Sequence, residues 1–194
     1  MEKLTRESLY SLEQYAEMRK SFREQVMAHK RNRRLALGTN ANLYFEDRMT
    51  MQYQVQEMLR AERIFDASGI NEEIEAYNPL IPDGTNWKAT FMVEFPDSEE
   101  RREMLQRLIG IEDRVWMQVD DFALIRPVAD EDMERETVEK TSAVHFLRFE
   151  LEPPQIKALK EGATLAAGID HENYRVDVRP VPANIRQSLV SDLD

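Results

Sequence analysis

The stretch WKATFMVEF, residues 87–95, decides the fold of this chain. An apolar side chain occupies every second position from Trp87 to Phe95, which is the period-two pattern of a half-buried β-strand. The same alternation returns in AVHFLRFEL, residues 143–151. Each stretch is followed by a short helical pattern that ends in a glycine. Two extended segments then follow in each case, 113–119 with 122–128, and 163–168 with 173–179.

These repeats predict two β-α-β-β units. The units also end alike, in IRPV at residues 125–128 and in VRPV at residues 178–181. The similarity suggests an internal duplication with a period of about 53 residues, although coincidence among short elements remains the alternative. We expect the two units to pair edge to edge into one twisted, mainly antiparallel sheet with its helices on one face.

The first 78 residues contain no proline and are free to be helical. Their periodicity predicts helices over 5–36, 42–67 and 71–77, and the later segments predict helices over 98–109, 154–161 and 182–192. The fold class is therefore α+β, with an N-terminal helical hairpin packed on the sheet. We expect a helical layer (1–78) and a sheet region (79–194) that together form one compact domain.

Composition excludes several classes of protein. The chain has 194 residues, 42% of them hydrophobic, and a formal net charge of −11. It has no cysteine, which excludes disulfides, thiol nucleophiles and thiolate-ligated iron–sulfur clusters. No apolar run approaches the roughly 20 residues of a membrane span. The first residues lack an apolar signal core, so we expect a cytoplasmic protein.

Positive charge is concentrated in one helical segment. Between Arg19 and Arg34 the chain has seven Lys or Arg against one Glu, a net charge of +6. Such a helix can pair with the acidic remainder of the chain, face solvent, or bind an acidic protein partner or an anion. Nucleic acid is a poor candidate, because the rest of the chain repels phosphate. The candidate partner-binding residues are Arg19, Arg23, Lys30 and Arg34.

The second predicted helix places Glu62 near the centre of its apolar face. A buried carboxylate must be paired, protonated or at the mouth of a cavity, and we expect an ion pair of Glu62 with Arg19 or Arg23. The alternative is a polar pocket between the helical layer and the sheet, with a basic residue as anion anchor. The candidate ligand-binding residues are Glu46, Tyr53, Glu57, Arg60, Glu62 and Lys88.

Catalytic and metal-binding signatures are missing from the sequence. The chain has three histidines, His29, His145 and His171, and no Glu-x-x-His pair. His145 alternates with apolar residues and is predicted to be a hydrogen-bonded core histidine, His171 to lie in a turn, and the acidic run 130–139 to be a solvated linker or helix. We therefore expect no catalytic residue, no metal site and no cofactor, although carboxylate ligation of magnesium or manganese stays open.

Several stretches are specific enough to carry a family resemblance over nearly the whole chain. They are FEDR (45–48), QEMLRAERI (56–64), YNPLIP (77–82), GIEDRVW (110–116) and KTSAVHFLRF (140–149). With these stretches the chain resembles an uncharacterised bacterial family of unknown function, commonly encoded beside rubrerythrin and an iron–sulfur oxidoreductase of the heterodisulfide-reductase type. The resemblance implies a setting of oxidative stress and electron transfer, and it supplies no catalytic residues.

Two functions follow as hypotheses. The first is a non-catalytic accessory protein of oxidative-stress defence that binds a neighbouring redox protein, either rubrerythrin or the iron–sulfur oxidoreductase, through electrostatic complementarity. The second is a small-molecule enzyme or sensor with its pocket between the helical layer and the sheet. A homodimer stays open, because the apolar stripes of the first two helices can pair within a chain or across a twofold axis.

Overall fold

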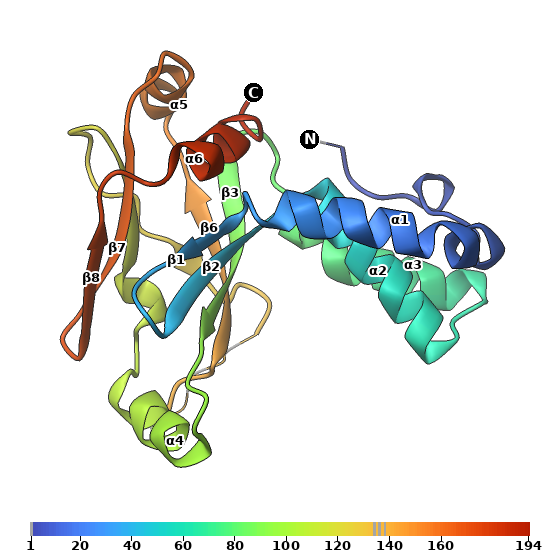
Figure 1. The fold of residues 1–194 in the computed structure, drawn as a ribbon, viewed down its shortest axis with the longest axis horizontal. Helices are drawn as coiled ribbons and strands as arrows, with labels where there is room; N and C mark the ends of the chain where they lie inside the picture. The colour runs from blue at the N-terminus through green and yellow to red at the C-terminus, as the bar shows by residue number, and fades with distance from the viewer. Residues whose placement is uncertain (1, 134, 136, 138) are drawn as a thin grey trace.

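A helical arm projects from a body of two β-sheets in the computed structural model, which describes residues 2–133, 135, 137 and 139–194 (Figure 1). The helices are α1 (Leu12–Lys30), α2 (Arg48–Glu62), α3 (Ala67–Tyr77), α4 (Ser98–Arg107), α5 (Pro153–Lys160) and α6 (Ala183–Val190), with short 3-10 turns η1 (Arg6–Ser8), η2 (Asn78–Leu80) and η3 (Glu112–Arg114). The strands are β1 (Arg34–Ala36), β2 (Ala41–Glu46), β3 (Asn86–Val93), β4 (Val115–Val119), β5 (Val128–Ala129), β6 (Val144–Glu150), β7 (Leu165–His171) and β8 (Tyr174–Val178).

The two stretches with alternating side chains form the centre of the larger sheet. Its strand order is β1-β2-β3-β6-β5, and every neighbouring pair is antiparallel. β3 pairs with β6 in a register that sets Trp87 opposite Phe149 and Phe91 opposite His145. The α+β class, the antiparallel pairing and the element orders β3-α4-β4-β5 and β6-α5-β7-β8 are confirmed. The predicted extended segment 122–128 is too long, because only Val128 of it belongs to a strand, β5.

The expectation of one sheet is wrong, because β4, β7 and β8 form a separate three-stranded sheet. The open edge of β3 is occupied by β2, which pairs with it from Ala41↔Val93 to Glu46↔Lys88. The second strands of the two units therefore pair with each other, β4 with β7, rather than extending the first sheet.

The chain between α1 and α2 is also extended rather than helical. α1 begins after the N-cap Ser11 and ends at Lys30, so the predicted helix 5–36 is too long. β2 was assigned to the start of the helix 42–67, because nearly all of its residues are buried and it lacks the alternation that marks a strand. Asp47 then caps α2 by accepting a hydrogen bond from the Thr50 amide. β1 and β2 thus belong to the sheet, although they lie within the segment 1–78 assigned to the helical layer.

The body and the arm have separate apolar interiors. In the body, one cluster of buried side chains contains residues of both sheets and of α4, α5 and α6. α5 and α6 lie at one end of the sheets and α4 at the other (Figure 1). In the arm, one cluster includes Met51, Val55 and Leu59 of α2, and another consists of Tyr15, Phe22 and Val26 of α1. None of the described helices is long and apolar enough to cross a membrane.

Candidate functional site

Two of the seven basic residues between positions 19 and 34 are neutralised within the chain. Arg19 of α1 forms a two-pronged ion pair with Glu57 of α2, at 2.7 Å from Nε to Oε1 and 2.8 Å from Nη2 to Oε2. The Tyr15 hydroxyl donates to the same Oε1 at 2.7 Å. The hydrogen bonds from Arg19 lower the pKa of Glu57 to about 2, whereas burial and the neighbouring carboxylate raise the pKa of Tyr15. This contact joins the first two helices of the arm.

Arg33 is the second neutralised residue and lies at the root of the arm. Its side chain is 2% exposed and pairs with Asp192, at 2.5 Å from Nη2 to Oδ2. It also lies 3.3 Å from the carboxylate of Asp47, which accepts a second contact from His29. Burial raises the pKa of Asp192 despite its partner. Arg33 therefore connects the start of α2 with the residues that follow α6.

The other five basic residues remain available to solvent or to a partner. Lys30 lies 5.9 Å from the Tyr53 ring centroid, and the Arg34 guanidinium lies 5.6 Å from that of Tyr44. Within the described part of the chain, no member of this group makes an ion pair. Four are exposed and Lys30 is half-buried. We refer to the group as the basic face, and its members are Lys20, Arg23, Lys30, Arg31 and Arg34.

The prediction for Glu62 is wrong in its pairing. Glu62 is exposed at the last residue of α2, and the carboxylate that Arg19 contacts is Glu57. Glu57 lies on the side of α2 that faces α1, whereas Glu62 belongs to the helix end, where its charge stays in water. Among the described residues Glu62 makes no ion pair.

The six predicted ligand-binding residues do not converge on one place. Glu57 and Arg60 are neighbours, 3.5 Å apart, and Tyr53 packs beside Phe22 of α1. Glu46 is buried at the end of β2, where its carboxylate accepts hydrogen bonds from two threonine hydroxyls, those of Thr50 and Thr90.

A cavity of about 490 Å³ does lie between the arm and the larger sheet, and Lys88 is the one predicted residue that lines it. Its walls are Tyr77, Pro79 and Leu80 on the arm side and Phe146 and Arg148 on the sheet side. The ammonium group of Lys88 donates to the Pro79 carbonyl. The predicted location of a pocket therefore agrees with the structure, but most of its predicted residues do not.

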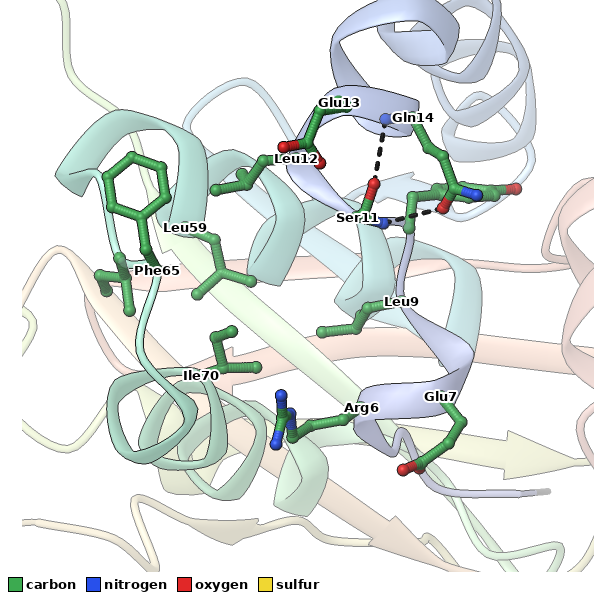
Figure 2. Close-up of a pocket in the computed structure, with 12 residues that line it drawn as sticks. Arg6, Glu7, Leu9, Ser11, Leu12, Glu13, Gln14, Leu59, Phe65 and Ile70 are labelled. Carbon is green, nitrogen blue, oxygen red and sulfur yellow. Dashed lines mark hydrogen bonds between the residues drawn. The ribbon is translucent and has the colours of Figure 1, made fainter.

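A groove of about 620 Å³ opens on the arm between the segment before α1, the end of α2 and the start of α3. Figure 2 shows Leu9, Leu59 and Ile70 around it, with Phe65 at its edge. Phe65 is 70% exposed. Glu7 and Glu13 also line the groove. The lining is therefore mixed polar and apolar, and an exposed aromatic ring beside it is a candidate protein contact.

The structure confirms that His145 is a buried, hydrogen-bonded residue of the core. It is fully buried, and it contacts Asp130 through Nδ1 and Thr141 through Nε2. Glu112 and Asp130, whose carboxylates lie beside it, were missed by the sequence analysis. Asp130 belongs to the acidic run 130–139, of which residues 134, 136 and 138 lie outside the described residues, and its side chain is only 10% exposed. No spacing signal connects positions 112, 130 and 145, because each comes from a different segment.

His171 ends β7, just before the turn to β8, and is 6% exposed. The Asn173 amide donates to its Nδ1 at 3.1 Å, and its Nε2 lies 3.0 Å from the Ile109 carbonyl. Its position beside a turn agrees with the sequence analysis, and both ring nitrogens lie within hydrogen-bond distance of backbone atoms.

Comparisons with known proteins place this structure beside others of unassigned function. The family model described as "Protein of unknown function (DUF3501)" matches residues 3–193. A crystal structure described as a novel protein of unknown function from Burkholderia pseudomallei K96243 is 49% identical in sequence. The match covers 100% of this chain and 100% of that one, with a TM-score of 0.94. No curated protein matches the chain.

Proposed function

The chain belongs to the DUF3501 family of proteins of unknown function, and on that premise we propose that it is a non-catalytic accessory protein whose arm binds a redox partner. The observation that carries the proposal is the basic face, five cations without an intramolecular ion pair in the described structure, on a chain of net charge −11. Surface charge that no internal ion pair neutralises can steer association with an acidic protein surface.

The position of the basic face supports a role in protein binding. α1 belongs to the arm, which extends away from the sheets (Figure 1). The ion pair Arg19–Glu57 holds α1 against α2, and Arg33–Asp192 anchors the chain just after α1, so the basic face is presented on fixed elements. The groove beside Phe65 adds apolar contacts from Leu9, Leu59 and Ile70, which charge alone does not supply.

The identity of the partner rests on the family resemblance. That resemblance implies a redox setting in oxidative-stress defence, with rubrerythrin or the heterodisulfide-reductase-type iron–sulfur oxidoreductase as the partner. In this proposal the partner supplies the metal centre that transfers electrons, and the present chain supplies recognition.

The test is association of the purified chain with each of the two candidate partners at low and high salt. Arg23→Glu with Arg31→Glu removes two exposed cations whose side chains make no ion pair with the residues that the structure describes, whereas Arg19 is unsuitable because it holds Glu57. The matched control is Lys157→Glu with Lys160→Glu on α5, which changes the net charge equally on the body. We expect the arm variant to lower the association rate at least tenfold and the α5 variant to change it less than threefold. Equal effects of both variants, or no association at any ionic strength, would reject the proposal.

A specific observation favours a second candidate, a small-molecule sensor or enzyme. The cavity between η2 and the sheet has apolar walls and brings Lys88 and Arg148 together with Glu131, which is the combination of apolar surface and a few polar groups that ligand sites use. Native mass spectrometry of the purified protein tests it. A co-purifying small molecule should disappear in Lys88→Met and remain in Lys157→Met, and its absence from the wild-type protein rejects this candidate.

A further inference from the structure

Three potential metal ligands meet inside the body and line neither the groove of the arm nor the cavity beside Lys88. Glu112 of η3, Asp130 after β5 and His145 of β6 each offer a donor atom within 4.8 Å of the others. Their side chains are 9%, 10% and 0% exposed. η3 leads into the smaller sheet and β6 belongs to the larger one, so the group lies where the two sheets meet.

The imidazole of His145 is held with one nitrogen directed at further donors. Asp130 Oδ2 lies 2.6 Å from Nδ1, and the other oxygen of Asp130 accepts from the Phe146 amide at 2.9 Å. The Asp130 carboxylate on Nδ1 orients the ring so that Nε2 faces Thr141, Ser142 and Glu112, and outer carboxylates commonly orient metal-binding histidines in this way. Asp130 adopts a left-handed backbone conformation, φ 49°, which places its carboxylate beside the ring.

The donors around Nε2 have the separations of a coordination shell. Nε2 lies 2.9 Å from Thr141 Oγ1, 3.1 Å from the Ser142 carbonyl oxygen and 3.7 Å from Glu112 Oε2. Thr141 Oγ1 and Glu112 Oε2 are 3.4 Å apart. Ligands at about 2.0 to 2.1 Å from a tetrahedral metal ion lie roughly 3.3 Å from one another, which is within this range.

We propose that this cluster binds one divalent first-row metal ion, with His145 Nε2 and the Glu112 carboxylate as ligands and Thr141 Oγ1 beside them. Asp130 is the positioning residue that orients the imidazole. One nitrogen ligand among oxygen ligands suits Zn²⁺ or Mn²⁺ and discriminates against Mg²⁺, which prefers oxygen alone. Because the cluster lies in the body, this site is independent of the binding role proposed for the arm.

Calorimetric titration of the full chain, stripped of metal with a chelator, tests the site with Zn²⁺, Mn²⁺ and Mg²⁺. We expect one Zn²⁺ per chain, weaker binding of Mn²⁺ and no measurable binding of Mg²⁺. Glu112→Gln should weaken Zn²⁺ binding at least tenfold, and Asp130→Asn should weaken it about 10- to 100-fold, as loss of an orienting partner does. The matched control is His29→Gln, which removes the other histidine–carboxylate contact of the described structure, and it should leave the affinity unchanged.

Circular dichroism of each variant shows whether it is folded, so that a lost site is distinguished from a lost fold. If His145→Gln does not fold, Glu112→Gln, Asp130→Asn and the Co²⁺ absorption spectrum of the wild-type protein decide whether the site exists. Co²⁺ bound by an imidazole and oxygen ligands in a tetrahedral site absorbs strongly in the visible region. Absence of Zn²⁺ binding, or binding that Glu112→Gln leaves unchanged, would overturn the proposal.

Discussion

In the body, one apolar cluster runs through both sheets and reaches three helices, whereas the arm contains two small clusters that are separate from it. The arm compensates with ionic contacts, Arg19–Glu57 between its helices and Arg33 at its root. Burial of a large continuous surface gives cooperative stability, while regions with few buried contacts open locally at lower cost. The comparison indicates that the body sets the stability of the chain and the arm is free to carry surface chemistry.

The strongest test of this comparison is a cavity in the body. Trp87 of β3 is fully buried, and its Nε1 donates to the Leu189 carbonyl of α6 at 2.9 Å. Trp87→Ala removes the largest fully buried side chain and one of the hydrogen bonds to that carbonyl, which also accepts from the Asp192 amide, so we expect the free energy of unfolding to fall by about 4 kcal/mol. Urea denaturation measures it. A loss below about 1.5 kcal/mol would mean that the body does not depend on this continuous core.

The second test is the root of the arm. Arg33→Ala leaves the carboxylates of Asp192 and Asp47 buried beside each other without their guanidinium, and we expect a loss of about 3 kcal/mol in the free energy of unfolding. The control is Arg102→Ala, which breaks an exposed pair with Glu99 on α4 and should cost less than about 0.5 kcal/mol. Similar losses in the two variants would contradict the role given to Arg33.

The third test concerns the contact between α1 and α2, and its sign depends on pH. The folded pKa of Glu57, about 2, lies below the ordinary value of 4.5, so its contribution is fully present above pH 4.5 and is lost as the pH falls towards 2. Solvent screens this partly exposed pair, and we expect Glu57→Gln to cost about 1 kcal/mol at pH 7.

Urea denaturation of wild type and Glu57→Gln between pH 7 and pH 2 checks the sign, because the difference between the two proteins should shrink below pH 4.5. Amide hydrogen exchange supplies the control. The variant should accelerate exchange in α1 and α2 while leaving β3 and β6 unchanged, and acceleration throughout the body would show that arm and body unfold as one unit.

The smallest expected effect on stability is at the groove of the arm. Phe65 is 70% exposed, so Phe65→Ser should change the free energy of unfolding by less than about 0.5 kcal/mol. Because the ring lies beside the groove, the same variant should weaken partner binding at least fivefold in the association assay. Phe122→Ser, on an exposed ring of the body, is the control, and an equal loss of binding in both variants would exclude the groove.

The sequence predicted what periodicity alone determines. β3 and β6 were found because their side chains alternate between a buried and a half-buried face. β2 was missed because it is buried on both sides, which removes the alternation and leaves a run that also fits a helix. The missing strand then led to the expectation of one sheet, since β2 occupies the edge that a second unit would need.

Candidate sites were harder to predict, because they depend on contacts between distant segments. Composition identifies the basic segment, and a basic face does exist on α1 and the residues just after it. Only the structure shows that Arg19 and Arg33 form ion pairs with Glu57 and Asp192. Helix periodicity predicts Glu62 on the apolar face of α2, but it does not show where the helix ends. α2 ends at Glu62, and the side chain lies in solvent. The group of Glu112, Asp130 and His145 had no local pattern, because tertiary packing alone brings it together.

The contact between Arg33 and Asp192 joins positions 159 residues apart. A truncation that removes residues 192–194 would therefore remove the Asp192 counter-ion of Arg33, at the base of the first helix. Loss of the carboxyl end would thus alter the orientation of an amino-terminal element. For anyone producing the protein, tags and fusions placed after Asp194 should be compared with amino-terminal ones before any partner measurement is trusted.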